Sequence, residues 1–384
     1  MAHSKPSFYE FFAGGGMARA GLGEGWTCLF ANDLCPVKAR SYRANWGEGE
    51  FRLGDIHALT PADLPGRADL AWASFPCQDL SLAGSGAGLK GARSGAFWGL
   101  WDLLDGLHAE GRLPRLLVVE NVVGTLTANK GEDFHALCHS LCDLGYRFGA
   151  LVIDAAHFLP HSRPRLFLVG VTRGSDLAAD VLTDGPAAPW CSKALRAAYA
   201  RLPASLRSHW LWWRLPPPPR TNLRLADLIE DEPADVRWHG FDETRRFLDM
   251  MSEPNRAKLR LAGASGGRMV GAIYRRTRPD GQGKRVQRAE VRFDGVAGCL
   301  RTPGGGSSKQ FLVVVEGDRL RTRLLSSREA ARLMGLPDSY ALPARHGEAL
   351  HLLGDGLAVH AVRHLDEHVL SAVAAPPVEP RIAA

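Results

Sequence analysis

Cys77 directly follows a proline at the end of an apolar run, a position where a cysteine can take part in chemistry. Residues 70–75 read as a buried strand, and the Ser-, Gly- and Ala-rich stretch after Cys77 reads as a loop. A cysteine there has four possible roles: nucleophile, metal ligand, half of a disulfide, or small core residue. Glu120 ends the apolar run "RLLVVE", and Arg163 and Arg165 lie next to the run "RLFLVGV". Taken singly, these three would be a structural acid and two ordinary surface charges.

A second group of residues suggests a nucleotide-like cofactor. Gly14, Gly15 and Gly16 follow the first predicted strand, where glycine lets a ligand approach the backbone. Asp33 ends the second strand and is placed to bind ribose hydroxyls, while the third candidate strand ends in "LGDI". A dinucleotide fingerprint requires a further glycine where this chain has Arg19. The pattern therefore favours S-adenosylmethionine, with an NAD enzyme or simple loop structure as alternatives.

These groups are spaced along alternating strand-like and helix-like segments in the first 170 residues. Such alternation predicts an α/β fold: a Rossmann-like, mixed, mostly parallel sheet with helices on both faces. Ligands of such sheets bind at the carboxyl ends of the strands. The sheet would therefore bring Cys77, Glu120 and the glycine loop to one edge.

The region from about 175 to 320 has a different, loop-rich texture and carries the excess charge. Between residues 256 and 292 there are eleven lysines and arginines against two acids, a net charge of +9, whereas the whole chain carries +6. This predicts contact with a polyanion, although a solvated basic face is the alternative. Trp210, Trp212 and Trp213 either stack on bases or pack between domains. A helix interrupted near Pro254 and a capping box from Ser326 to Glu329 are also predicted.

Composition narrows the class of protein. Seven cysteines without framework spacing fit a reducing cytoplasm, and no apolar run reaches the roughly 20 residues that a membrane span needs. The N-terminus lacks the pattern of a signal peptide. No cysteine or histidine stands at ligand spacing from Cys77, so neither a metal nor a disulfide is expected there, and no metal cofactor is expected. Cys138 and Cys142, one helical turn apart, are predicted to be packed in the interior.

In order along the chain, these segments resemble the motifs of the DNA cytosine-5 methyltransferase family. "FAGGG" is similar to its first motif, "FPCQDLSLAG" to its nucleophile motif, "VENV" to its glutamate motif and "RPR" to its arginine motif. "REAARLMGLPD" and "GDGLAV" are similar to its ninth and tenth motifs. The Pro-Cys-Gln and Glu-Asn-Val pair in this order is highly specific, and the resemblance covers nearly the whole chain.

The resemblance implies a role for each matching residue. Cys77 would be the nucleophile, Glu120 the acid that engages the cytosine ring, and Arg165, with Arg163, the support of the flipped base. The implied cofactor-binding residues are Phe12, Ala13, Gly14, Gly15, Gly16, Asp33, Leu34, Asp55, Ile56, Pro76, Asp355 and Gly356. The candidate DNA-binding residues, partly from the basic segment and partly from the implied active-site loop, are Ser81, Arg93, Arg268, Arg275, Arg276, Arg278, Lys284 and Arg285.

The implied organisation is a catalytic domain over 1–172, a target-recognition domain over 173–322, a segment over 323–375 that returns to the catalytic domain, and a disordered tail over 376–384. Asp355 replaces the usual asparagine, His161 the usual glutamine, and Leu34 a frequent aromatic residue. We expect methyl transfer from S-adenosylmethionine, giving S-adenosylhomocysteine, to carbon 5 of a flipped cytosine in duplex DNA. The alternatives are the same chemistry on tRNA and a non-catalytic DNA-binding relative. We expect a cytoplasmic, nucleoid-associated monomer, with a cognate restriction endonuclease as a candidate partner.

Overall fold

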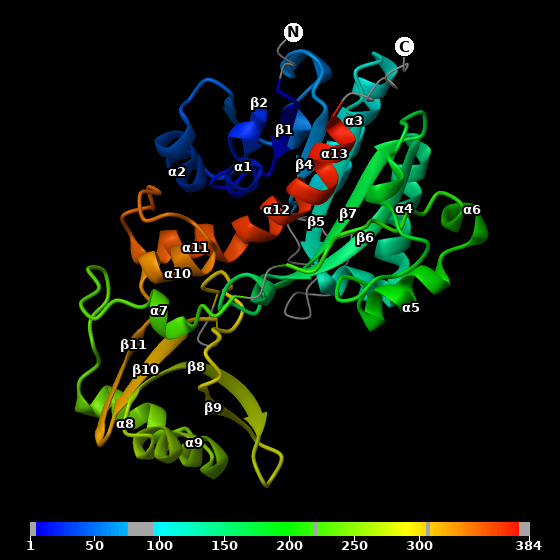
Figure 1. Ribbon diagram of the computed structural model, residues 1–384. Coiled ribbons are helices and arrows are strands. Elements are labelled where there is room, and N and C mark those ends of the chain that lie inside the picture. The colour runs from blue at the N-terminus through cyan, green and yellow to red at the C-terminus, as the bar shows by residue number, and fades with distance from the viewer. Residues whose placement is uncertain (1–4, 76–94, 219–220, 305–307, 376–384) are drawn as a thin grey trace, which may run out of the picture. The chain divides into compact units, whose positions relative to one another are not determined.

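The computed structural model describes residues 5–75, 95–218, 221–304 and 308–375, which form two compact units (Figure 1). The first unit comprises Met1–Asp154, Pro164–Pro218 and Ala361–Ala384, and the second comprises Ala155–Arg163 and Pro219–His360. These units differ from the domains expected at 172 and 322. Residues 173–218 belong to the first unit, and residues 323–360 belong to the second.

The first unit is built on a seven-stranded sheet in the order β3-β2-β1-β4-β5-β7-β6. Its strands are β1 (Ser7–Phe11), β2 (Thr27–Asp33), β3 (Phe51–Leu53), β4 (Leu70–Ala73), β5 (Leu116–Val122), β6 (Tyr146–Asp154) and β7 (Pro164–Thr172). The pairs among β1 to β5 are parallel, whereas β7 runs antiparallel to both β5 and β6. The sheet is therefore mixed and mostly parallel, which confirms the predicted fold class.

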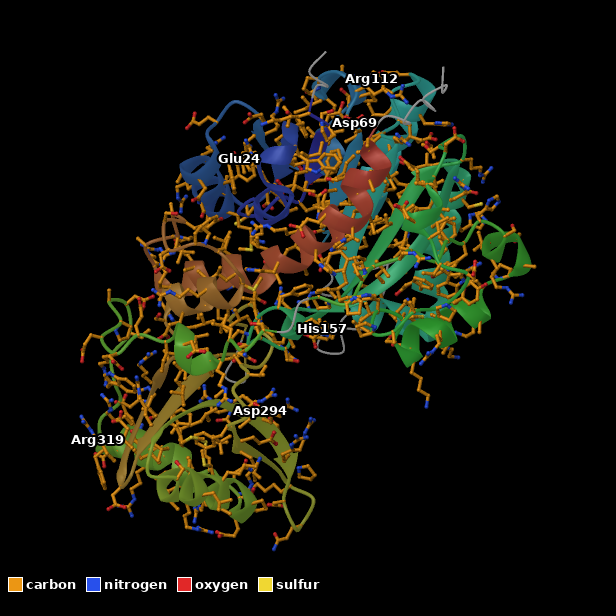
Figure 2. All side chains as sticks on the ribbon, viewed as in Figure 1. Glu24, Asp69, Arg112, His157, Asp294 and Arg319 are labelled. Carbon is orange, nitrogen blue, oxygen red and sulfur yellow. The ribbon has the colours of Figure 1, made fainter. Side chains whose placement is uncertain are left out.

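Helices connect the strands and cover the sheet because their apolar positions recur at helical spacing. They are α1 (Met17–Leu22), α2 (Pro36–Trp46), α3 (Ala96–Ala109), α4 (Glu132–Asp143), α5 (Lys193–Arg201) and α6 (Ala204–Arg207). One apolar core joins α3, α4 and α5 to the sheet, and Cys138 of α4 is buried within it, as predicted. Figure 2 labels two residues at the amino ends of central strands: Asp69, directly before β4, and Arg112, shortly before β5.

The tryptophans before the proline run are part of the first unit's interior. Trp210 packs edge-on against Phe148, with ring centroids 5.8 Å apart. The indole N–H of Trp213 donates to the carbonyl of Val169 at 3.3 Å. Both side chains are buried. Their packing lies within one unit, so the expectation of a tryptophan cluster between domains is wrong.

The C-terminal segment of the first unit is helical. Helix α12 (Val359–Leu365) continues through a π-helical turn, Asp366–Leu370, into α13 (Ser371–Ala374), and Figure 1 shows this red segment lying along the sheet. The Trp26 indole N–H donates to the Asp366 carboxylate at 2.8 Å across a sequence separation of 340 residues. This bond ties the end of the described chain to its beginning.

The second unit is built on a four-stranded antiparallel sheet in the order β11-β10-β8-β9. Its strands are β8 (Arg268–Pro279), β9 (Arg285–Arg292), β10 (Gln310–Glu316) and β11 (Arg319–Leu324). Its helices are α7 (Leu225–Leu228), α8 (Phe241–Asp249), α9 (Glu253–Ala264), α10 (Ser327–Leu333) and α11 (His346–Asp355). The break between α8 and α9 confirms the interruption predicted near Pro254, because proline is accommodated in the first turn of a new helix.

A buried ion pair holds α10 to β11. The Arg323 guanidinium donates to both carboxylate oxygens of Glu329, at 2.5 and 2.8 Å, and both side chains are fully buried. Glu329 also accepts the backbone N–H of Ser326 at 2.8 Å, while the Ser326 hydroxyl accepts the N–H of Glu329 at 3.1 Å. The predicted capping box is thus confirmed, with a buried cation added to it. None of the helices in the described ranges is long and apolar enough to cross a membrane.

Candidate active site

The glycine loop after β1 has the backbone that its sequence suggests. Gly14 and Gly16 adopt left-handed conformations, with φ of +58° and +77°, and Phe12 does so as well at +56°. A Cβ atom at Gly16 would lie 2.3 Å from the Trp46 indole nitrogen, so only glycine fits there. A Cβ atom at Gly14 would meet nothing within 4 Å, so the backbone there faces open space. The Trp46 N–H donates to the Gly15 carbonyl at 3.0 Å and so fixes the backbone of the loop.

Asp33, at the end of β2, is bonded to the loop itself. Its carboxylate accepts the N–H of Gly14 at 2.8 Å and that of Cys35 at 2.7 Å, and the side chain is buried. The neighbouring Ala13 N–H donates to the Asn32 carbonyl at 2.8 Å. Because a carboxylate has about four lone-pair positions, these bonds leave capacity for ribose hydroxyls. Asp33 therefore positions the loop in this structure, and its contact with a ribose stays a prediction.

The end of β3 carries the predicted polar and apolar pair. The Asp55 carboxylate accepts the N–H of His57 at 3.0 Å and caps a short 3₁₀ helix, Ile56–Ala58. Ile56 is buried against α3, where a Cβ atom on Gly99 would lie 2.9 Å from its side chain. Leu34, after β2, is 66% exposed. An exposed leucine beside the loop offers an apolar surface that could meet a flat base.

Glu10 of β1 is a buried acid that the sequence reading did not single out. One carboxylate oxygen accepts the N–H of Arg19 at 3.4 Å, and the side chain is 1% exposed. Burial raises the pKa of Glu10 to about 8. The Arg19 guanidinium lies over the rings of Trp46 and Tyr42, with its carbon 5.2 and 5.9 Å from their centroids. Arg19 therefore packs on the two aromatic rings at the sequence position where a dinucleotide-binding fold would have glycine.

Glu120 and Arg165 meet at the carboxyl edge of the sheet. The Arg165 Nε lies 3.3 Å from a carboxylate oxygen of Glu120, and both side chains are mostly buried. Glu120 is near the end of β5, whereas Arg165 is near the start of β7. The two residues share an edge because β7 is antiparallel to β5, with Arg165 opposite Val122. The structure therefore places together two of the residues predicted to be catalytic.

Asn121 ties this edge to the end of β4. Its amide donates to the Phe75 carbonyl at 3.5 Å, and its carbonyl oxygen accepts the N–H of Val122 at 2.8 Å. In β4, Ala73 pairs with Val119, so the chain leaves β4 beside Glu120 and continues toward Cys77. The predicted residues Pro76, Cys77, Ser81 and Arg93 lie outside the described residues.

Arg163 and His161 belong to the second unit, where both are buried. The Arg163 guanidinium donates to the carbonyls of Leu300, Gly354 and Gly356, at 2.7, 2.8 and 2.6 Å. The backbone N–H of Leu300 donates to His161 Nε2 at 3.1 Å, so its Nδ1 carries the proton and donates to the Leu333 carbonyl at 3.0 Å. These bonds support a positioning role for Arg163, which holds the turn that follows α11.

That turn contains Asp355 and Gly356, the two predicted cofactor residues of the second unit. Asp355 is the last residue of α11, and Gly356 follows it directly. A Cβ atom on Gly354 would lie 2.5 Å from the backbone nitrogen of Thr302, so the turn packs closely against the backbone of Arg301 and Thr302. The cofactor contacts of Asp355 and Gly356 stay a prediction.

The basic segment covers most of α9 and the hairpin of β8 and β9, and its charges are partly paired. Arg276 and Arg278 lie 3.5 and 2.7 Å from the Glu290 carboxylate. Arg275 lies over the Phe311 ring, 5.3 Å from its centroid. Arg268 pairs with two acids from outside the segment, Asp231 and Glu316.

Lys284 and Arg285 are the exposed pair at the tip of the hairpin. In the described part of the chain no ion pair is recorded for either side chain. The positive charge of this region is smaller than the count of +9 suggested. Four acids from outside residues 256–292 pair with its arginines: Asp231, Glu253, Asp294 and Glu316. Figure 2 labels Asp294, which pairs with Arg292. Lys284 and Arg285 are therefore the stronger phosphate-binding candidates.

Comparison with known proteins agrees with this geometry. The family model described as "C-5 cytosine-specific DNA methylase" matches residues 7–371. The chain is 25% identical to the type II methyltransferase M.DsaV of Dactylococcopsis salina over 373 residues, covering 97% of this chain and 88% of that protein. It is 23% identical to the type II methyltransferase M.HhaI of Haemophilus parahaemolyticus over 375 residues, covering 95% and 94%. Among solved structures, the S. pombe Dnmt2 methyltransferase aligns with a TM-score of 0.56 at 18% identity, covering 96% of this chain and 99% of that one.

The fold and the site together define a methyltransferase of the Rossmann-like class. A glycine loop and two strand-end acids form one half of the edge, and a buried glutamate–arginine pair forms the other. The chain belongs to the C-5 cytosine-specific DNA methylase family. The predicted family and enzyme class, a DNA (cytosine-5-)-methyltransferase, are thereby confirmed.

Proposed function

We propose that this protein transfers a methyl group from S-adenosylmethionine to carbon 5 of a flipped cytosine in a specific duplex DNA sequence, through a bond between Cys77 and carbon 6. The observation that carries the proposal is the contact between Glu120 and Arg165, 3.3 Å apart at the edge where β4 leads to Cys77. An acid and a cation at this edge can engage one small ring, and Cys77 follows the last residue of β4, Ala73, by four positions in the sequence.

The chemistry requires a residue of each type. Carbon 5 of cytosine is a poor nucleophile until a thiolate adds to carbon 6 and places electron density on carbon 5. Glu120 shares a proton with ring nitrogen 3 and offsets the charge that this addition creates. Arg165 binds the carbonyl oxygen of the ring and fixes the orientation of Glu120. When a base removes the carbon-5 proton, the bond between sulfur and carbon 6 breaks and the ring double bond re-forms.

The cofactor fits the glycine loop. S-adenosylmethionine supplies an electrophilic methyl group on a sulfonium. Gly14 exposes backbone to open space, Asp33 and Asp55 stand at two neighbouring strand ends, and Leu34 offers an apolar surface. These groups suit a ligand with a ribose and a flat base but without a pyrophosphate.

A stacked cytosine is out of reach of any of these groups, so the target base must leave the helix, at a cost of a few kcal/mol. Phosphate contacts from Lys284 and Arg285 would offset this cost, and arginines such as Arg276 could read guanine edges. A double-stranded DNA substrate follows from this use of the hairpin. A cognate restriction endonuclease and a monomeric state stay predictions.

A covalent trap tests the proposal. A duplex library carrying 5-fluorocytosine, incubated with cofactor and full-length protein, should give an adduct stable to denaturation, because fluorine blocks the final elimination. Cys77→Ser should abolish the adduct, and Cys142→Ser, a matched change on α4, should keep it. An adduct that persists in Cys77→Ser would falsify the assignment of the nucleophile.

Substrate class is tested by transfer of tritium from labelled cofactor to duplex DNA and to tRNA in parallel. We expect label in DNA. Label in tRNA alone would contradict the DNA substrate while leaving the chemistry intact. Bisulfite sequencing of DNA from cells that express the protein would then give the recognition sequence.

A further inference from the structure

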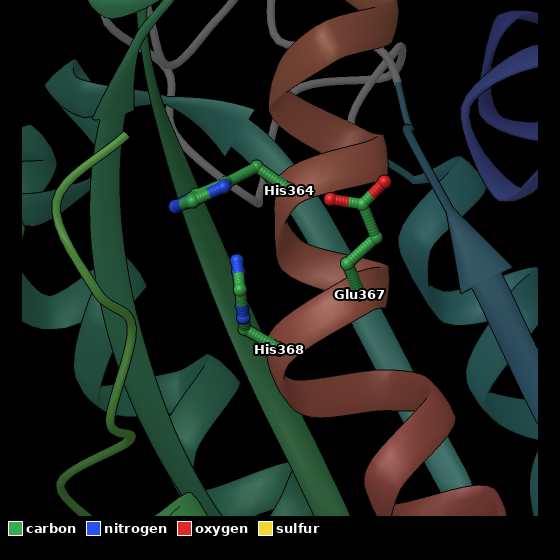
Figure 3. A group of neighbouring side chains, drawn as sticks. All are labelled: His364, Glu367 and His368. Atoms are coloured by element: carbon green, nitrogen blue, oxygen red, sulfur yellow. The ribbon is translucent and has the colours of Figure 1, made fainter. Parts of the chain in front are cut away.

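The C-terminal helix of the first unit carries three metal-ligating side chains that methyl transfer does not use. His364, Glu367 and His368 each offer one ligand atom, and these atoms lie within 4.8 Å of one another. Figure 3 shows His364 on one turn of the helix and Glu367 and His368 on the next, with the ring of His368 directed toward that of His364. In the sequence "HLDEH" the two histidines stand four residues apart, with Glu367 directly before the second.

The helix geometry brings the two imidazoles close together. Residues three and four apart share a helix face, and here the spacing of four falls where α12 passes into the π-helical turn Asp366–Leu370. The ring centroids of His364 and His368 are 4.6 Å apart at an interplanar angle of 72°. π-helical turns occur frequently at functional sites, where they re-aim side chains.

His364 has the surroundings of a histidine that binds metal. It is 5% exposed, and its Nε2 lies 2.8 Å from the carbonyl of Pro216. A carbonyl only accepts, so Nε2 carries the proton and Nδ1 is the acceptor nitrogen of the ring. The Trp190 ring packs against the imidazole at 5.7 Å between centroids, and its own N–H donates to the Leu215 carbonyl at 2.5 Å. A backbone carbonyl on the second ring nitrogen is the usual way in which a ligating histidine is oriented.

We propose that His364, Glu367 and His368 bind a divalent transition-metal ion, with Zn²⁺ as the representative ion and water completing the coordination. Two imidazoles and one carboxylate suit zinc, cobalt, nickel or copper, whereas magnesium and calcium prefer oxygen alone. Zinc–ligand bonds of about 2.1 Å require ligand atoms roughly 3.4 Å apart, so small rotations of the accessible Glu367 and His368 side chains close the site. No metal was predicted from the sequence, because no cysteine or histidine stands at ligand spacing from Cys77.

The bound ion would link residues one turn apart and so stabilise the C-terminal helix where α12 passes into the π-helical turn. Its anchor is His364, which is held through Pro216 and Trp190, and its other ligands lie one turn further along the helix. The site lies within the first unit, on residues outside the proposed methyl-transfer machinery. The proposal therefore goes beyond the proposed function and does not depend on it.

Helix α4 provides a matched control with the same residue types. Glu132, His135 and His139 have spacings of three and four, and the ring centroids of the two histidines are 6.3 Å apart. The side chains of His135 and His139 are 41% and 60% exposed, and His139 is engaged by Asp143 at 2.7 Å. This second pair tests whether any two histidines on a helix would account for metal binding.

Calorimetric titration of the metal-free full chain with Zn²⁺ tests the proposal. We expect one saturable site in the wild type, a dissociation constant at least about tenfold higher in both His368→Gln and Glu367→Gln, and no change in His135→Gln/His139→Gln. Circular dichroism and the melting temperature without metal confirm that each variant is folded. Glu367→Gln serves alone if His368→Gln fails to fold, since the Glu367 side chain is exposed.

Two further results complete the test. Zinc should raise the melting temperature of the wild type and of the α4 variant, but not that of Glu367→Gln, because binding to the folded state alone stabilises it. Mg²⁺ should give no comparable shift. The proposal is overturned if the wild type takes up no zinc, or if the α4 substitutions abolish uptake while Glu367→Gln and His368→Gln leave it intact.

Discussion

Replacing Trp46 by phenylalanine should weaken cofactor binding without disturbing the fold. The change removes one bond, the donation from the indole N–H to the Gly15 carbonyl at 3.0 Å, and it leaves an aromatic ring beneath the Arg19 guanidinium. A net hydrogen bond contributes about 0.5–1.5 kcal/mol. If the cofactor binds only the loop conformation that this bond selects, the dissociation constant rises by about 2- to 12-fold. Calorimetric titration with S-adenosylhomocysteine measures it.

Trp26→Phe is the matched control for this prediction. It removes a buried indole donor in the same unit, one that bonds Asp366 at 2.8 Å and takes no part in the glycine loop. We expect Trp26→Phe to lower the midpoint of urea unfolding while S-adenosylhomocysteine binds as in the wild type. The reasoning is refuted if Trp46→Phe binds with wild-type affinity, or if both variants lose affinity equally.

Three other predictions concern buried and exposed charges. Glu329→Gln should lower the free energy of unfolding by about 3–5 kcal/mol because it leaves the buried Arg323 cation without its counter-ion. A double-mutant cycle with Arg323→Met, measured by urea unfolding, should give a coupling energy of at least about 2 kcal/mol. Because burial raises the pKa of Glu10 from 4.5 to about 8, the folded chain keeps a proton that the unfolded chain releases. As the pH rises from 4.5 to about 8, the free energy of unfolding of the wild type should therefore fall relative to that of Glu10→Gln, by up to about 1.4 kcal/mol per pH unit. Equal pH slopes of the two proteins in urea unfolding would contradict this. Lys284→Gln with Arg285→Gln should reduce the slope of log affinity for duplex DNA against log salt by about 2, as filter binding at several salt concentrations would measure.

Features that depend on neighbours in the sequence were predictable. The glycine loop, the strand-end acids and the capping box at Ser326 and Glu329 each follow from local backbone requirements. The order of strand and helix also predicted the mostly parallel sheet, because each short apolar run needs cover on both faces. Glu120 and Arg165 meet because β7 runs antiparallel to β5, an orientation that the alternation of strands and helices alone did not predict.

Features that depend on distant partners were not predictable. Trp46 supports Gly15 across 31 residues, and Arg163 bonds carbonyls more than 130 residues away. No pattern near either residue identifies such a partner. Charge counting failed for a similar reason, because Asp231 and Glu316 reach Arg268 from outside the basic segment.

The bond between Trp26 and Asp366 has a consequence for synthesis. Its partners are separated by 340 residues. At about 5–20 residues per second, a ribosome needs roughly 17–70 s to make the second partner after the first. The second unit, whose main segment Pro219–His360 is contiguous, is complete before Ala361 is made. The first unit must therefore wait, with β1 and β2 already made, until Asp366 has been made. We expect its folding to be completed after that of the second unit and to be the slower of the two.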